Sequence, residues 1–226
     1  MFKALLKWFR AENLLVQAQN LVLEMLITVQ ELFEDSVKLL WTGEGATIDD
    51  IRERDKAINQ LVREVRKKVL THLAFSGSGG IELSLVMVNL VVYIERIGDY
   101  TKDIAYLATD YPGRIEAGEF EPQVHEFEKK LNGRLKKLID VFSEDEEDSD
   151  LAASLTGTHK EMNLKYRQIV DLLMDEERNK LSPRDSAKLS LYLRYLRRVE
   201  GQIFNVASSE VNPFHRISFK IRKKKK

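Results

Sequence analysis

The sequence predicts an all-α fold, and three observations support this prediction. Charged residues make up 32% of the 226 residues, whereas only four prolines and 11 glycines interrupt the chain. Such a composition, rich in Leu, Glu, Lys and Arg, favours long amphipathic helices. No stretch alternates apolar and polar residues as a half-buried strand does. The spacing of the helical segments then suggests two tandem three-helix bundles.

Apolar periodicity and turn signals divide the chain into six helices. Thr47 or Asp49 can cap the second helix, and Ser182 can cap the sixth, with Pro183 at its first helical position. Residues 75–80 are a glycine-rich turn, and the acidic run 143–150 is a solvated spacer. We therefore expect a first helix over residues 12–41 and a second from the cap at 47 or 49 to residue 73. Four more helices are expected over residues 81–109, 121–142, 151–178 and 183–210.

The order of helix lengths repeats, with a break near Pro112-Gly113. Residues 191–199 resemble residues 90–97, and aligning Tyr195 with Tyr93 places Asn205 opposite Asp103. We therefore expect a first bundle over residues 12–111 and a second over 112–211. A basic amphipathic segment at 1–11 precedes them, and a basic tail at 212–226 follows.

The net charge is zero, but basic residues gather at both ends. Residues 1–10 and 216–226 hold ten basic residues and no acid, which leaves 26 basic against 36 acidic residues and a net charge of −10 elsewhere. That body should repel nucleic acid, so no nucleic-acid partner is expected. The basic ends suit peripheral contact with the inner membrane face, or a groove of a partner. The alternatives are that the first segment packs on the chain's own bundle or on a second subunit, and that the last is a disordered, solubilising tail.

Composition also bounds location and chemistry. The chain has no cysteine, which excludes disulfides, thiolate metal sites and thiol catalysis. It has no apolar run long enough to span a membrane and no signal-peptide pattern, so a cytoplasmic protein is expected. None of the four histidines belongs to a Glu-x-x-His pair, and Gly77-x-Gly79-Gly80 is a turn between helices. We therefore expect no enzyme activity.

The strongest local signal is an acidic row formed by Glu95, Asp99 and Asp103. Because the three recur every fourth residue, they lie along one helix face. A neighbouring stripe of Ile94, Ile97, Thr101 and Ile104 should be buried. Three carboxylates in line repel one another, so cations should offset them. These cations could come from Arg96 and Lys102 on the same helix, from neighbours such as Arg52 or Arg66, or from a bound metal.

The same residues resemble the signature of the PhoU family of phosphate-uptake regulators. In that family the motif reads Glu-Arg-Ile-Gly-Asp-His, followed after two residues by Asn-Ile-Ala, and residues 95–105 are similar to it. The resemblance extends over roughly residues 12–211. It implies two similar three-helix bundles whose facing acidic residues bind iron or another transition or divalent metal. It also implies a regulatory partner of phosphate transporters and of a sensor kinase, without enzyme activity.

The resemblance implies four metal ligands, which are Asp55, Glu95, Asp99 and Asp103. The chain also departs from the family pattern. Asn59 stands where a second acid is usual, and Asp103 stands where Asn is usual. In the second half the motif positions carry other residues, so no metal site is expected there: Arg197, Gly201, His159 and Asn163.

Three functions remain open from the sequence. The first is a PhoU-like regulator that binds a phosphate transporter component or a sensor kinase. It is expected to form a homo-oligomer, namely a dimer. The second is a metal-binding carboxylate helical bundle acting as a store or an enzyme. The third is a structural helical adaptor in which the acidic row serves only for salt bridges.

Overall fold

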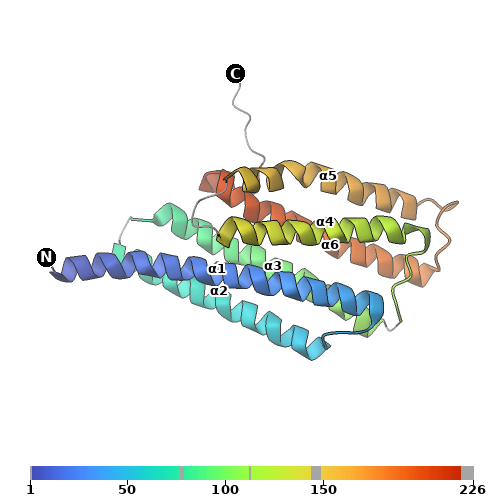
Figure 1. The fold of residues 1–226 in the computed structure, drawn as a ribbon, viewed down its shortest axis with the longest axis horizontal. Coiled ribbons are helices and arrows are strands. Elements are labelled where there is room, and N and C mark those ends of the chain that lie inside the picture. Colours follow the sequence, from blue (N-terminus) through green and yellow to red (C-terminus); the bar gives the residue numbers. More distant parts are fainter. Residues whose placement is uncertain (1, 77–78, 112, 144–148, 220–226) are drawn as a thin grey trace, which may run out of the picture.

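The computed structural model describes residues 2–76, 79–111, 113–143 and 149–219, and side chains there except those of residues 2–13 and 149. This part of the chain is all-α, as predicted, with six α-helices and no strand (Figure 1). The elements are α1 (Phe2–Thr42), α2 (Ile48–Ser76), α3 (Ile81–Asp110), the 3-10 turn η1 (Gly118–Phe120), α4 (Glu121–Ser143), α5 (Ser149–Leu173), α6 (Pro183–Val211) and the 3-10 turn η2 (Phe214–Arg216).

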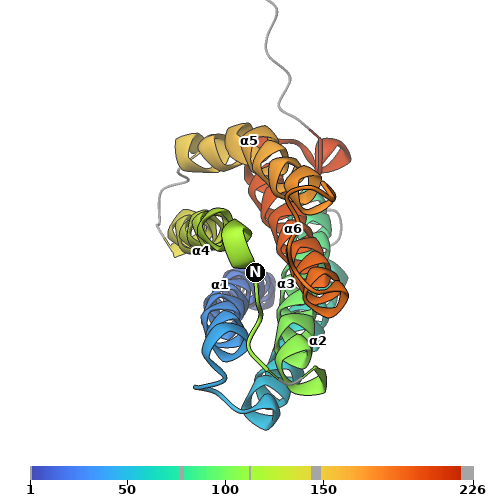
Figure 2. The same ribbon diagram turned by 90° about the vertical axis from the view of Figure 1, so that its right-hand side faces the viewer.

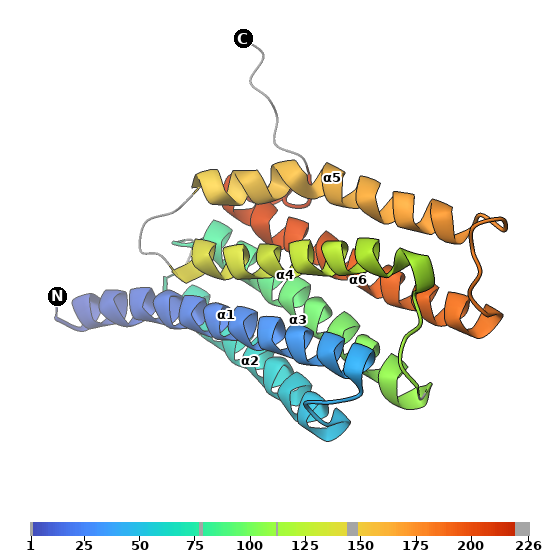
Figure 3. The ribbon, with the colours of Figure 1, turned by 45° about the vertical axis from the view of Figure 1, so that its right-hand side comes forward.

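The helices form two tandem three-helix bundles, as the sequence predicted. Helices α1 to α3 pack on one another, and α4 to α6 form the second group (Figure 2). The two groups lie side by side, with α1 against α4 and α3 against α6 (Figure 3). Lys188 of α6 also donates to the carbonyls of Tyr111 and Gly113, at 2.9 and 2.8 Å. The link between the bundles is therefore fixed to the second bundle.

Two predicted helix caps are present. Thr47, rather than Asp49, caps α2: its hydroxyl accepts from the Asp50 amide at 3.2 Å, and the Asp50 carboxylate accepts from the Thr47 amide at 2.9 Å. The Ser182 hydroxyl accepts from the Asp185 amide at 3.1 Å before Pro183 opens α6. Both arrangements satisfy amides that the first helical turn leaves without partners.

The first helix is longer than predicted, since it begins at Phe2 and not at Glu12. No proline or glycine separates residues 2–12, so nothing in the backbone stops the helix there. The segment 1–11 is therefore continuous with α1. The predicted membrane or partner contacts of its side chains lie outside the described residues, as do residues 220–226 of the predicted tail.

Helix α5 is shorter than predicted, since it ends at Leu173 and not at Arg178. The Asp175 carboxylate accepts from the Glu177 amide at 3.0 Å, and the Asn179 side-chain amide donates to the Leu173 carbonyl at 2.9 Å. Short polar side chains that bond to nearby backbone compete with helix continuation. At its other end α5 begins at Ser149, and residues 144–148 of the predicted acidic loop lie outside the described part.

The predicted apolar stripe of α3 is buried. Ile94, Ile97, Thr101 and Ile104 are all inaccessible to solvent. Gly98 lies on the same face, where an added Cβ would stand 3.1 Å from Ile58 Cδ1 of α2. The glycine therefore lets α3 approach α2 closely, which brings the acidic row beside α2. Within the described ranges, no helix combines the length and hydropathy needed to cross a lipid bilayer.

Candidate functional site

The acidic row of α3 lies at the edge of the first bundle, beside α2. Glu95, Asp99 and Asp103 are partly buried, and Asp55 of α2, which is 9% exposed, lies beside them. The Lys102 ammonium donates to Asp55 Oδ2 at 2.8 Å and to Asp99 Oδ1 at 3.1 Å. The cation that offsets the row is therefore a side chain of α3 itself, and it also ties α3 to α2.

The other expected cations have smaller roles. Arg52 donates to the Tyr106 hydroxyl at 3.1 Å and pairs with Asp49 at 3.3 Å, so it is directed away from the row. The charges of Arg96 and Arg66 act on Glu95 and lower the pKa of its carboxyl, but they do not outweigh the opposing effects. Lys102 is thus the main counter-ion of this site.

Burial and like charges shift the ionisation of the row. Burial, followed by the charge of Asp99, raises the pKa of Glu95 above its ordinary value. The same two causes raise the pKa of Asp103. Burial alone would lower the pKa of Lys102, but its hydrogen bonds to Asp55 and Asp99 raise it overall. Lys102 pairs with Asp55 and Asp99, so the negative charges of Glu95 and Asp103 are only partly offset.

Replacing Glu95 with glutamine should stabilise the fold at pH 7. Because folding raises the pKa of Glu95, its favourable contribution is complete below the unfolded-state pKa and is lost as pH rises through the folded-state pKa. Glu95→Gln should therefore raise the free energy of unfolding by about 0.5 kcal/mol at pH 7, with no gain near pH 4. Urea denaturation at the two pH values measures this difference. Glu53→Gln, at an exposed position on α2, is the control, and an equal gain there would contradict the assignment.

The residues around Lys102, as arranged, do not fit a metal ion. A metal would compete with an ammonium that already lies between the Asp55 and Asp99 oxygens. Among the described residues, no group of three or more His, Asp or Glu is placed to hold an ion. Metal binding by Glu95, Asp99, Asp55 and Asp103 thus stays a prediction that would need Lys102 to move away.

Replacing Lys102 with methionine should expose the repulsion that the ammonium offsets. The variant should lose about 1–3 kcal/mol of unfolding free energy, because Asp55 would remain mostly buried without its partner. Added Mn²⁺ should restore part of the loss, since carboxylate oxygens suit such an ion. Thermal melting with and without MnCl₂ measures both effects. Lys102→Arg, which keeps the charge, should melt close to the unaltered chain, and an unchanged melting temperature in Lys102→Met would contradict this account.

The second bundle keeps the contacts of this site but changes its chemistry. In the register predicted for the repeat, His159 corresponds to Asp55 and Phe204 to Lys102. The rings of His159 and Phe204 stack with centroids 4.2 Å apart, at the position in the second bundle that corresponds to the Asp55–Lys102 ion pair of the first. Asn163 donates to the carbonyl of His159 at 3.1 Å, as Asn59 donates to that of Asp55 at 3.0 Å. The two bundles are therefore matched in detail.

A buried carboxylate replaces the acidic row in the second bundle. Glu200, which corresponds to Gly98, is 1% exposed and accepts from Arg134 Nε at 2.8 Å and from His159 Nδ1 at 3.0 Å. Arg134 of α4 also donates to the Leu155 carbonyl at 2.8 Å and to the Thr158 hydroxyl of α5. These contacts join all three helices of the second bundle. Glu200 thus holds the bundle together and does not face a ligand.

Comparison with known proteins agrees with this arrangement. Residues 22–108, which run from α1 to α3, match the family model described as the PhoU domain. This part of the chain is similar to a PhoU domain. The resemblance predicted from residues 95–105 is therefore confirmed, and the acidic row with Lys102 lies inside the matched PhoU region.

Relatives extend the likeness beyond that domain. A "Phosphate-specific transport system accessory protein PhoU homolog" of Pseudomonas putida is 25% identical over 177 residues, which cover 76% of this chain and 68% of the relative. A homolog of the same description from Pseudomonas aeruginosa is 25% identical over 156 residues, which cover 66% of this chain and 64% of the relative. Both similarities reach well past the first bundle in length.

Solved PhoU structures show the same fold over both bundles. The regulatory protein PhoU from Streptococcus pneumoniae superposes with a TM-score of 0.77 at 17% identity, covering 89% of this chain and 95% of the other. PhoU from Pseudomonas aeruginosa superposes with a TM-score of 0.76 at 22% identity, covering 88% of this chain and 96% of the other. The second half therefore has the PhoU fold although its motif residues differ.

Sequence reasoning missed a second buried carboxylate, Glu128 of α4. Its Oε1 accepts from Trp41 Nε1 of α1 at 2.6 Å and from the Tyr192 hydroxyl of α6 at 2.5 Å. Its Oε2 accepts from His125 Nδ1 at 2.8 Å. Burial and the charge of Glu128 raise the pKa of Tyr192 well above its ordinary value, so the phenol stays a donor. This network joins the first bundle to the second. Helical spacing places Glu128 on the buried face of α4, beside Val124 and Leu131, but no local motif indicates its partners.

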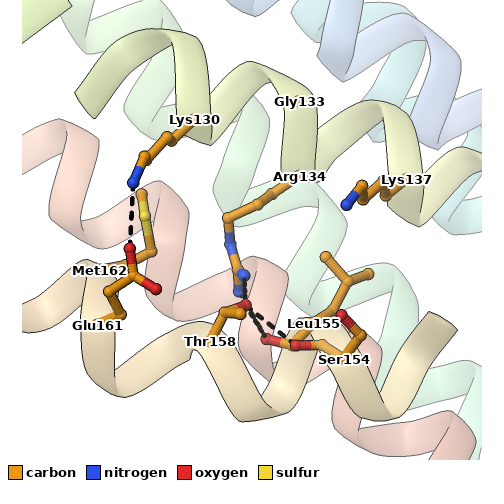
Figure 4. Close-up of a pocket in the computed structure, with 9 residues that line it drawn as sticks. All are labelled: Lys130, Gly133, Arg134, Lys137, Ser154, Leu155, Thr158, Glu161 and Met162. Carbon is orange, nitrogen blue, oxygen red and sulfur yellow. Dashed lines mark hydrogen bonds and ion pairs between the residues drawn. The ribbon is translucent and has the colours of Figure 1, made fainter. Parts of the chain in front are cut away.

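A hollow of about 300 Å³ between α4 and α5 adds no clear site (Figure 4). Figure 4 shows Lys130 and Arg134 reaching from α4 toward α5. Lys130 pairs with Glu161 at 3.1 Å, and Arg134 is held by Leu155, Thr158 and Glu200. Those two cations already have protein partners, so the hollow does not present them to a ligand.

Proposed function

We propose that this chain regulates phosphate transport and phosphate-dependent signalling by binding a component of a phosphate transporter or a sensor kinase. The observation that supports it most is a PhoU fold over both bundles, with 89% of this chain and 95% of a PhoU regulatory protein superposed. Both curated relatives are named as accessory proteins of a phosphate-specific transport system. The proposed role is binding without chemical turnover.

Such a regulator acts only through unequal contact with two states of its partner. Docking shifts a transporter or kinase toward the state that it binds more tightly, and the shift cannot exceed the difference in binding free energy. The edge formed by Glu95 and Asp103 offers under-compensated negative charge for such contact. A basic surface on the partner would complement it.

Co-purification tests the proposal. The tagged chain, expressed from its own locus, should retain a phosphate transporter component or a sensor kinase, identified by mass spectrometry. Deleting the gene should change phosphate uptake or the response to phosphate starvation, and the unaltered gene should restore both. Unchanged uptake and signalling after deletion would count against the proposal. Light scattering of the purified chain tests the predicted dimer separately.

A second candidate is a structural helical adaptor, and the Lys102 ion pairs favour it. In that role the acidic row would serve only to join α3 to α2 through Asp55 and Asp99. Elemental analysis of the purified chain separates this from the predicted iron or other metal. Metal lost on replacing Glu95 and Asp99 together with alanine would support a metal role. A metal-free chain that still retains its partner would favour the adaptor.

A further inference from the structure

The second bundle contains a polar hollow where the PhoU motif of the first bundle has its acidic row. The hollow measures about 410 Å³ and lies between α5 and α6. Three arginines of α6 line it, together with three side-chain amides: Arg194, Arg197, Arg198, Asn163, Gln202 and Asn205. All six side chains carry hydrogen-bond donors, of which those of Asn163 already bond to His159 and one of Asn205 bonds to Gln202 Oε1. The site that is acidic in one bundle is therefore basic in the other.

The three arginines lack a carboxylate partner among the described residues. Within the described part of the chain none of them forms an ion pair, whereas Arg134 is paired with Glu200. Glu200 lies on the same helix, but it is buried and already accepts from Arg134 and His159. Side chains at i, i+3 and i+4 of a helix are neighbours, so these like charges repel one another unless an anion lies between them.

The hollow has open space for a ligand beside Gly201 of α6. Gly201 lines it, and a Cβ added there would meet nothing within 4 Å. Its neighbour Arg197 is held over the Tyr166 ring, with the guanidinium 4.9 Å from the ring centroid. A guanidinium fixed in this way loses less freedom when it binds an anion. Open space thus lies beside a positioned donor.

We propose that this hollow binds a phosphoryl group. A carboxylate is satisfied by one guanidinium fork, whereas a phosphate carries more acceptor oxygens and a larger negative charge. Three arginines, with the amides of Gln202 and Asn205 beside them, match the phosphate better. The source is either inorganic phosphate or the phosphate of a small organic ester. This site lies outside the matched PhoU region and can be tested on the purified chain, independently of the proposed regulatory function.

Calorimetric titration of the purified full chain tests the site. The probes are inorganic phosphate and glucose 6-phosphate, with acetate at equal ionic strength as the carboxylate comparison. Arg197→Gln removes one guanidinium, and Gly201→Asp places a carboxylate in the hollow. Each variant should weaken phosphoryl binding about tenfold or more. Circular dichroism and thermal melting establish that both variants fold.

Two further variants serve as controls. Gly201→Ala adds only a methyl group in open space, and Arg167→Gln removes an exposed arginine of α5 that does not line the hollow. Both should bind as the unaltered chain does. Binding of phosphate alone, or tighter binding of the ester, supports the site and identifies the source. The proposal would be overturned if acetate bound as tightly as phosphate, or if Gly201→Asp left phosphoryl binding unchanged. It would also be overturned if neither probe gave a binding heat or a shift of the melting temperature.

Discussion

Glu200→Ala is expected to lower the free energy of unfolding by about 3–5 kcal/mol. The carboxylate is 1% exposed and accepts from Arg134 and His159. Without it the Arg134 guanidinium, which is 6% exposed, would keep its charge in the interior and lose its only carboxylate partner among the described residues. Removing one member of a buried ion pair is costly for this reason. Urea denaturation followed by circular dichroism measures the loss.

An exposed ion pair of the same bundle provides the control. Glu161 pairs with Lys130 at 3.1 Å, but both side chains are well exposed, so Glu161→Ala should change stability by less than about 1 kcal/mol. The double variant Arg134→Met with Glu200→Leu should recover much of the loss, because apolar replacements remove both buried charges together. A loss for Glu200→Ala as small as that for Glu161→Ala would show that Glu200 is not buried as described.

Glu128→Ala is the second change with a large expected effect, about 3 kcal/mol or more. It would leave three donors without their acceptor, namely Trp41 Nε1, the Tyr192 hydroxyl and His125 Nδ1. A buried donor left unsatisfied costs about 1–3 kcal/mol. Tyr192 is inaccessible to solvent, so water cannot replace the lost bond without opening the structure. Urea denaturation followed by circular dichroism measures the loss of stability.

Graded variants make this prediction sharper. Tyr192→Phe removes one donor and leaves the carboxylate in place, so it should cost about 1 kcal/mol. Glu126→Ala, on the same helix, breaks only exposed pairs with Lys130 and Lys165 and should be nearly neutral. If Tyr192→Phe and Glu128→Ala were equally destabilising, the network would not be held by the carboxylate as the distances indicate.

Local patterns in the sequence were sufficient for much of the fold. The stripe from Ile94 to Ile104 follows from helical spacing, and the caps at Thr47 and Ser182 follow from side chains that bond to nearby amides. The repeat register, set by aligning Tyr195 with Tyr93, is supported by the matching contacts of Asp55 with Lys102 and of His159 with Phe204. These features depend on residues within one helix or one helix pair.

Long-range partners could not be predicted in the same way. Lys102 was one of several candidate cations, and only the packing of α3 on α2 places it between Asp55 and Asp99. Helical spacing from Val124, Leu131 and Leu138 places Glu128 and Arg134 on the buried face of α4. It does not indicate their hydrogen-bond partners, which are up to 87 residues away. The roles of such residues depend on which helices meet, which spacing along one helix does not specify.

The contacts of α1 with α4 and of α3 with α6 have a consequence for how the molecule melts. Each half uses the other to cover part of its apolar surface, so loss of one half would expose core residues of the other. Heat should therefore disrupt both halves in a single cooperative transition, and neither half should retain its full thermal resistance when produced alone.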